Sequence, residues 1–169
     1  MVNLKQFRDY RSLIMKKICE NRKIVDLITN ESNSSATPDE LIKTHVYPFE
    51  FIPGTTEEGK SFISMLFSVP EVDNGMTSLT CYFKIYIVTY VELAWAKDDD
   101  NVSALRYDLI AEEIDKTLNG LIDTGFKVSL LARKDGYQPM HHWHGTALTY
   151  EVQAWNRPKQ SHRTEAYDG

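Results

Sequence analysis

Three histidines stand within four positions in the segment Met140-His141-His142-Trp143-His144. Imidazole nitrogens are good ligands for zinc or iron, so this segment is the first place to look for chemistry. If the segment is extended, His142 and His144 share one face while His141 points the other way. At most two of these side chains can then reach the same ion, and two ligands do not make a metal site.

A third ligand would have to come from His45 or from the consecutive aspartates Asp98–Asp100. No His-x-x-x-His or His-Glu-x-x-His spacing supplies a standard metal scaffold. We interpret the aspartates as helix-start residues, because carboxylates favour the positive end of the helix dipole. We interpret the histidine segment as a loop or strand start at the rim of a sheet, with Trp143 packed and the imidazoles exposed or at a subunit contact. A metal-dependent enzyme using His141–His144 is the alternative hypothesis.

Other catalytic signatures are absent from the sequence. It has no Gly-rich phosphate loop and no Gly-x-Ser-x-Gly motif. Cys19 and Cys81 have no histidine nearby in sequence to activate them, and we expect both to be buried free thiols. Glu112 and Glu113 are adjacent on an expected helix, so their side chains point about 100° apart and are expected to face solvent. The sequence therefore predicts no catalytic residue, no cofactor and no enzymatic activity.

Composition indicates one compact domain. The chain has 169 residues, of which 42% are apolar, which is enough to build a core without disulfides or metals. We expect a single α+β domain over residues 1–157 and a flexible C-terminal tail over 158–169. A net charge of -5 argues against general binding to nucleic acid. No apolar run is long enough to span a membrane, and the N-terminus lacks an apolar signal-peptide region, so we expect synthesis in a cytoplasm.

Periodicity in the sequence predicts the main elements. Helix patterns and a capping box fall at residues 3–19, 22–28, 37–40 and 101–119. Strand patterns fall at residues 61–69, 80–95, 126–133 and 148–154, and Asp135-Gly136 is a turn signal. Residues 45–53 contain two prolines and are expected to form an extended edge segment. Together these predict a mainly antiparallel sheet of about four strands around a long central strand, packed by the N-terminal helix and a central amphipathic helix.

The longest strand pattern, Thr80 to Trp95, has two different faces. One face is apolar and consists of Cys81, Phe83, Ile85, Ile87, Val91, Leu93 and Trp95. The other carries Tyr82, Lys84, Tyr86, Tyr90 and Glu92. Tyrosine offers a large apolar area with a polar tip, so this second face is suited to contact with a neighbouring subunit. The residues expected at such an oligomer interface are Tyr82, Tyr86, Tyr90, Trp143 and Trp155.

The order helix, long strand, helix and two strands resembles the tail terminator, or tail-completion, proteins of long-tailed bacteriophages and prophages. The resemblance covers residues 1–157, more loosely before residue 60. It is carried by the segments Ile85–Val88, Leu105–Ile114 and Gly145–Val152. Residues 30–53 and the histidine segment do not match the family pattern.

The resemblance implies a small α+β subunit that forms a homo-hexameric ring on the end of a finished tail tube. Such a ring stops tail growth and presents the docking surface for the head, so the implied partners are the tail-tube protein and a head-completion or connector protein. Double-stranded DNA would pass through the ring without specific binding. The implied location is the tail-neck region of the virion, assembled in the bacterial host cytoplasm. Another neck or tube-end component with the same fold is the alternative.

Overall fold

The computed structural model describes residues 4–42, 44–54, 59–68, 78–123 and 126–155. The fold is α+β, as predicted. The tail expected over residues 158–169 lies outside the described residues. In chain order the elements are α1 (Leu4–Glu20), α2 (Arg22–Thr29), α3 (Pro38–Leu41), β1 (Val46–Tyr47), β2 (Ser61–Ser68), β3 (Ser78–Tyr90), the 3₁₀ turn η1 (Val91–Leu93), β4 (Trp95–Lys97), β5 (Ser103–Leu105), α4 (Arg106–Leu118), β6 (Ile122–Asp123), β7 (Phe126–Tyr137) and β8 (Trp143–Trp155).

Within these residues, six strands form the main sheet in the order β1-β2-β3-β8-β7-β6, and β4 and β5 form a separate hairpin. The central strands β3 and β8 pair antiparallel over their whole lengths, from Ser78 opposite Trp155 to Tyr90 opposite Trp143. β1 runs parallel to β2, and the other pairings described are antiparallel. The predicted antiparallel sheet with a long central strand is confirmed, and the predicted edge segment supplies the short strand β1.

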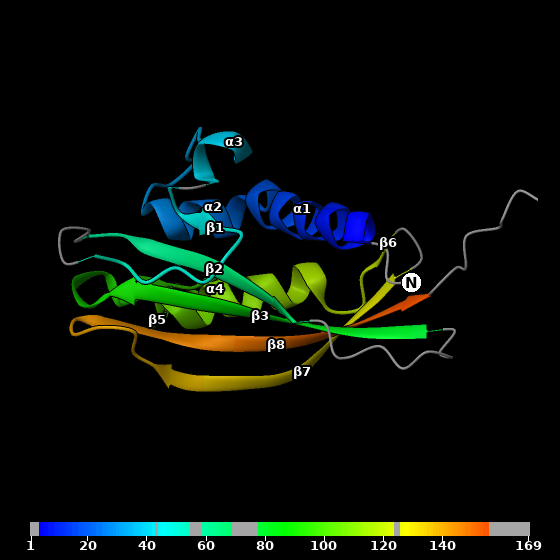
Figure 1. Cartoon of the computed structure of the whole chain (residues 1–169). Helices are drawn as coiled ribbons and strands as arrows, with labels where there is room; N and C mark the ends of the chain where they lie inside the picture. The colour runs from blue at the N-terminus through cyan, green and yellow to red at the C-terminus, as the bar shows by residue number, and fades with distance from the viewer. Residues whose placement is uncertain (1–3, 43, 55–58, 69–77, 124–125, 156–169) are drawn as a thin grey trace, which may run out of the picture.

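One face of the sheet is covered by helices (Figure 1). The apolar face predicted for the long strand is buried from Cys81 to Ile87, where it packs in one core with residues from α1, α2 and α4. The helix residues in this core recur at three- and four-residue spacings, as an amphipathic helix requires. They include Ile14, Ile18, Ile24, Ile28, Ile110, Ile114 and Leu118. The sequence patterns therefore identified the main core correctly.

Local signals also placed the helix ends. The Asn21 side chain accepts hydrogen bonds from the amides of Lys23 (3.0 Å) and Ile24 (3.3 Å), which caps α2. The predicted capping box starts α3, where the Glu40 carboxylate accepts from the Thr37 amide at 2.7 Å. These short-range contacts satisfy helix amides that would otherwise lack partners.

The long strand ends earlier than predicted. β3 stops at Tyr90 rather than Trp95, and the chain turns through η1. The neighbouring strands begin at this level, with Ser61 opposite Thr89 and Trp143 opposite Tyr90, so a longer β3 would have no partner. The alternation of residues beyond Tyr90 therefore does not belong to β3, and the prediction that Val91, Leu93 and Trp95 continue the apolar face of this strand is wrong.

The predicted helix start is also wrong. Residues 103–105 pair with 95–97 as a hairpin, and α4 begins only at Arg106. Asp98–Asp100 occupy the hairpin turn instead of capping a helix. The Asp98 carboxylate accepts from the amides of Asp100 (3.0 Å) and Val102 (2.7 Å), the local bonding that makes aspartate a turn residue. Asp98–Asp100 therefore mark the turn of the β4–β5 hairpin and not the start of a helix.

The last two strands are longer than predicted, and β7 contains two bulges. Asp135-Gly136 lies inside β7 at a register shift and is not a turn. Gly136 has a φ of 74°, which suits glycine at such a bulge. A second shift between Leu130 and Ala132 changes the face on which the following residues lie, so Ala132 is exposed, whereas unbroken alternation over residues 126–133 predicts that it points inward with Val128 and Leu130. A bulge breaks the two-residue period on which the prediction relied.

Arg106, the first residue of α4, is buried and joins three segments. Its guanidinium donates to the carbonyls of Leu93 (2.7 Å) and Leu27 (2.9 Å) and to the Asn30 side-chain oxygen (2.8 Å). Leu27 lies in the last turn of α2, where carbonyl oxygens form the negative end of the helix dipole. Desolvation lowers the Arg106 pKa, yet arginine stays charged in proteins. The side chain therefore fixes the root of the hairpin to α2 and α4.

Replacing this arginine tests its role. Arg106→Met should lower the free energy of unfolding by about 3 kcal/mol, because buried carbonyl groups lose their donors. Amide hydrogen exchange should rise in β4 and β5 more than in β3. The control Arg8→Met removes an exposed guanidinium paired with its neighbour Asp9 and should change stability by less than about 0.5 kcal/mol. Unchanged exchange in the hairpin would contradict the anchoring role.

Gly145 gives a second stability prediction. A Cβ added there would lie 1.8 Å from the Ile87 carbonyl oxygen, because β3 and β8 approach closely at this point. Gly145→Ala should therefore cost about 3 kcal/mol or more in chemical denaturation. Gly120→Ala is the control: Gly120 has a φ of 80° with open space around it, so backbone strain alone should cost about 1 kcal/mol. Equal losses for the two variants would contradict the close-approach argument.

Candidate functional site

The sheet face opposite the helices, called the open face below, is only partly covered. At the end near Tyr90, a second apolar group packs on it, formed by the buried residues Tyr47, Phe62, Val88 and Trp143 with the flanking Phe51, Tyr90, Tyr137 and Met140. Tyr47 and Phe51 stack with ring centroids 3.8 Å apart. The chain following β1 therefore lies over this end of the face, and we call the group the aromatic cluster.

The rest of the open face presents side chains to solvent. Leu66 on β2 lies opposite Lys84 on β3, which lies opposite Thr149 on β8. Leu66 is 40% exposed and Lys84 is also exposed. Because alternate residues of a strand share a face, Tyr82 and Tyr86 flank Lys84 there. We define the open patch as Leu66, Tyr82, Lys84, Tyr86, Lys134 and Thr149.

The open face is positively charged although the chain carries a net charge of -5. The strand register places Lys84, Lys127, Lys134 and Glu151 on it, and Glu50 lies near Tyr86 and Tyr137. Among these described residues, three positive charges stand against two negative ones. An acidic surface would therefore be attracted to this face of an otherwise acidic protein.

The residues predicted for an oligomer interface fall into different environments. Tyr82, Tyr86 and Tyr90 share the open face and are half-buried. Tyr86 contacts Tyr137, with ring centroids 4.8 Å apart, and burial followed by the nearby Glu50 raises the pKa of its phenol. Trp143 is only 2% exposed and belongs to the aromatic cluster, so it offers no surface to a partner. The side chain of Trp155 lies outside the described residues.

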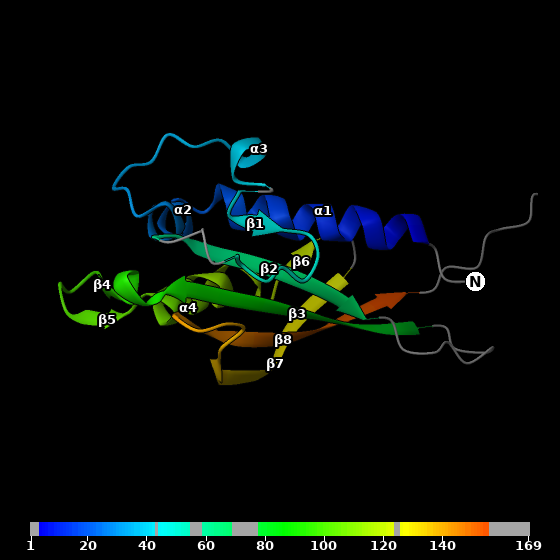
Figure 2. The same cartoon turned by 60° about the vertical axis from the view of Figure 1, so that its left-hand side comes forward.

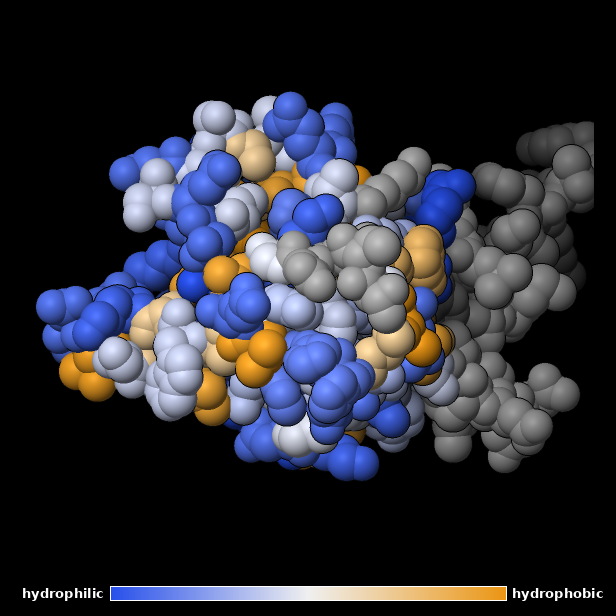
Figure 3. Space-filling view, turned by 90° about the vertical axis from the view of Figure 1, so that its left-hand side faces the viewer, coloured by the Kyte–Doolittle hydropathy of each residue, from blue (hydrophilic) through white to orange (hydrophobic). Residues whose placement is uncertain are grey.

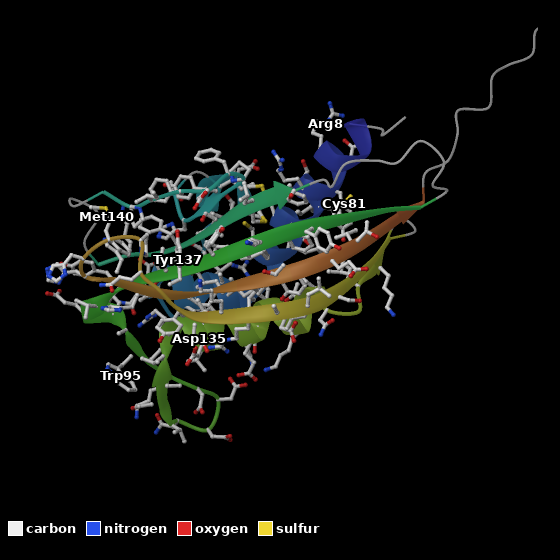
Figure 4. All side chains as sticks on the ribbon, turned by 60° about the horizontal axis from the view of Figure 1, so that its bottom comes forward. Arg8, Cys81, Trp95, Asp135, Tyr137 and Met140 are labelled. Carbon is white, nitrogen blue, oxygen red and sulfur yellow. The ribbon has the colours of Figure 1, made fainter. Side chains whose placement is uncertain are left out.

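The β4–β5 hairpin projects from the body of the molecule (Figures 2 and 3). Trp95 lies opposite Leu105, and Trp95 is 65% exposed. Figure 4 shows Trp95 on a ribbon that stands clear of the main sheet. The sequence pattern did not separate this element from β3, because the apolar alternation of β3 continues into β4. The turn-forming run Asp98–Asn101 between two short apolar stretches was the signal that could have revealed it.

A charged hollow of about 370 Å³ lies between the hairpin, α2 and α4. Three of its acidic residues have lysine partners: Lys23 reaches Asp99 at 2.5 Å and Glu113 at 3.9 Å, and Lys116 reaches Glu112 at 2.8 Å and Glu113 at 2.9 Å. The Lys23 hydrogen bond lowers the pKa of Asp99. The lysines therefore neutralise much of the acidic surface here, and they link the hairpin to both helices.

The histidines do not form a metal site in the described part of the chain. His141 and His142 are exposed with ring centroids 4.1 Å apart, and His144 is exposed at the start of β8. No group of three or more metal-ligating side chains comes together among the described residues. The interpretation of this segment as a strand start with Trp143 packed and the imidazoles exposed is confirmed. His45 lies elsewhere, beside Phe62.

Both cysteines are buried free thiols, as predicted. Desolvation raises the pKa of Cys19 and of Cys81 to about 11. Because the thiolate is the reactive form, neither residue is suited to act as a nucleophile near neutral pH.

His45 makes stability depend on pH. Burial, followed by the nearby Lys60, lowers its pKa below the ordinary value of 6.5. The unfolded chain therefore takes up this proton at higher pH than the folded chain. The free energy of unfolding should fall as pH drops below about 6.5 and level off below the folded pKa.

Urea denaturation from pH 8 to 5 should show that His45→Gln removes this share of the pH dependence. His144→Gln, at an exposed site, should retain it, and identical profiles for His45→Gln and the parent chain would contradict the assignment.

Comparison with known proteins identifies a family. No helix in the described segments has the length and apolar character needed to cross a membrane. No curated protein and no solved structure matches the chain. The family model YomW matches residues 21–152, which run from the start of α2 into β8. Because this match covers well over half of the chain, the protein belongs to the YomW family, which is associated with phages and prophages.

Proposed function

We propose that the chain is a structural virion protein that caps the end of a phage tail tube as a ring, stops tail growth and forms part of the head-tail joint. The proposal combines membership of a phage-associated family with the resemblance to tail terminators in segments of β3, α4 and β8. In this role the protein has no catalytic activity and needs no cofactor. Its partners are copies of itself in a homo-hexamer, the tail-tube protein and a head-completion or connector protein.

The observation that carries the proposal is the open patch. A strand face buried on one side by helices leaves Leu66 and Lys84 exposed on the other, together with half-buried tyrosines. A mixture of exposed apolar, tyrosine and basic side chains is suited to a protein interface. The aromatic cluster next to it gives this surface a rigid border, so a partner would bind a preformed site.

The described side chains also support a structural role. Three charged side chains near the hairpin have structural roles. Asp98 closes a turn, Lys23 forms an ion pair with Asp99, and Arg106 makes buried hydrogen bonds. The exposed histidines lack a third ligand within the described residues. An overall acidic chain suits a channel for DNA, because a lumen that bound phosphate would slow its passage.

Capping is tested with tail tubes assembled from purified phage tail-tube protein. The purified chain should bind one end of each tube, appear there as a six-fold ring in negative-stain images, and stop elongation when more tube protein is added. Lys84→Glu should weaken capping at least tenfold, because it reverses the charge at the centre of the open patch.

Lys16→Glu is the matched control, since it makes the same exchange at an exposed position on α1, away from the open face. It should cap tubes like the parent chain. Tubes that keep growing with the parent chain present would contradict the terminator function. Binding to the connector without binding to tubes would instead assign the chain to another neck component.

A further inference from the structure

The β4–β5 hairpin has one face toward the body and one face without a partner in the described structure. Ala96 and Ala104 lie opposite each other and are half-buried, whereas Trp95 lies opposite Leu105 on the other face. Val102 at the turn is 58% exposed. Large exposed apolar side chains on so small an element are a mark of an interaction site, and tryptophan is a frequent anchor at interfaces.

The hairpin is held in its projecting position. Arg106 donates to the Leu93 carbonyl from its side chain and to the Ala94 carbonyl from its backbone, each at 2.7 Å. At the other end, Asp98 closes the turn and Asp99 is paired with Lys23. These contacts prevent the ribbon from rotating its apolar face onto its own sheet. Among the described residues Trp95 stays 65% exposed, so its side chain is available to a second molecule.

The open patch of this chain has matching properties. It offers Leu66, Tyr82 and Tyr86 as apolar contacts, with Lys84 and Lys134 as positive charges. The hairpin tip carries Asp98–Asp100 and Lys97, and because Asp99 is paired with Lys23, these residues together have a net charge of -1. An apolar anchor next to a net negative tip thus complements an apolar surface next to a net positive strand face.

We propose that the β4–β5 hairpin of one copy docks on the open patch of a second copy, with Trp95 against the Leu66 and tyrosine side chains and Asp100 toward Lys84. The inference rests on the ring of the proposed function and names its contact. Two different surfaces meet, so the contact is head-to-tail, and repeating it by rotation closes a ring. Every copy uses its hairpin once and its open patch once.

Two single variants test the contact. Trp95→Ser removes the exposed anchor, and Lys84→Glu reverses the charge of the patch. In sedimentation velocity over a concentration series, each variant should self-associate at least tenfold more weakly than the parent chain. A mixture should re-form one junction, between the intact hairpin of Lys84→Glu and the intact patch of Trp95→Ser. The expected product is a 1:1 dimer that grows no further.

A charge exchange completes the test. Asp100→Lys combined with Lys84→Glu should restore ring formation to within about threefold of the parent chain, because the opposite charges meet again. Asp39→Lys combined with Lys84→Glu is the matched control and should not restore it, since Asp39 is exposed on α3. The proposal is overturned if the mixed single variants stay monomeric, or if both exchanges restore assembly equally. It is also overturned if the parent chain remains monomeric up to about 1 mM, the limit of weak specific binding.

The tube-capping assay separates this inference from the proposed function. Capping that survives Trp95→Ser, with normal rings, overturns the hairpin contact and leaves the terminator function standing. Rings that depend on Trp95 and Lys84 but do not bind tubes support the contact and contradict the terminator function.

Discussion

The antiparallel pairing of β3 with β8 along their full lengths determines where the other elements lie. Once these strands are side by side, alternate residues of β3 face opposite sides of the sheet. Cys81, Phe83, Ile85 and Ile87 face the helices, and Tyr82, Lys84 and Tyr86 lie on the open face. The pair approaches so closely at Gly145 that a methyl group would not fit. Because α1, α2 and α4 all pack on the same face, the described residues cover the opposite face only with the aromatic cluster. The open patch is thus a consequence of strand pairing and helix placement.

The end of β3 creates the second distinctive surface. Its neighbours stop at Tyr90, so the chain must leave the sheet, and η1 turns it into the hairpin. A two-stranded ribbon is marginal on its own. Here Arg106 ties its root to the last turn of α2 and to the start of α4. The same guanidinium that stabilises the core therefore presents Trp95 in a fixed position, which lowers the entropy lost on binding a partner.

Much of the fold could be predicted from local patterns, and the misses have physical causes. The stripe from Ile110 to Leu118 and the strand alternation from Cys81 to Ile87 depend on burial by a regular element, which periodicity reports directly. The end of β3 depends on where β2 and β8 begin, a long-range fact that alternation within one strand does not contain. The bulge at Gly136 and the turn at Asp98 were both marked by turn-forming residues, but those residue types do not reveal which kind of irregularity they form. For the candidate site, the tyrosine face and the packing of Trp143 were predictable, whereas the exposure of Trp95 followed only from tertiary packing.

A head-to-tail contact built from a hairpin and a sheet face also explains how an acidic protein could assemble with itself. Chains of net charge -5 repel one another at a distance, so most encounters between copies are unfavourable. In the proposed contact the open face reverses this locally, since its lysines would attract the aspartates of the hairpin tip and repel other basic surfaces. Electrostatics would then select the orientation, and the apolar contact of Trp95 would hold it. Each junction can be weak, because closing a ring makes the last junction intramolecular and raises its effective concentration. A subunit of this kind would remain separate at low concentration and assemble where a tube end holds several copies together.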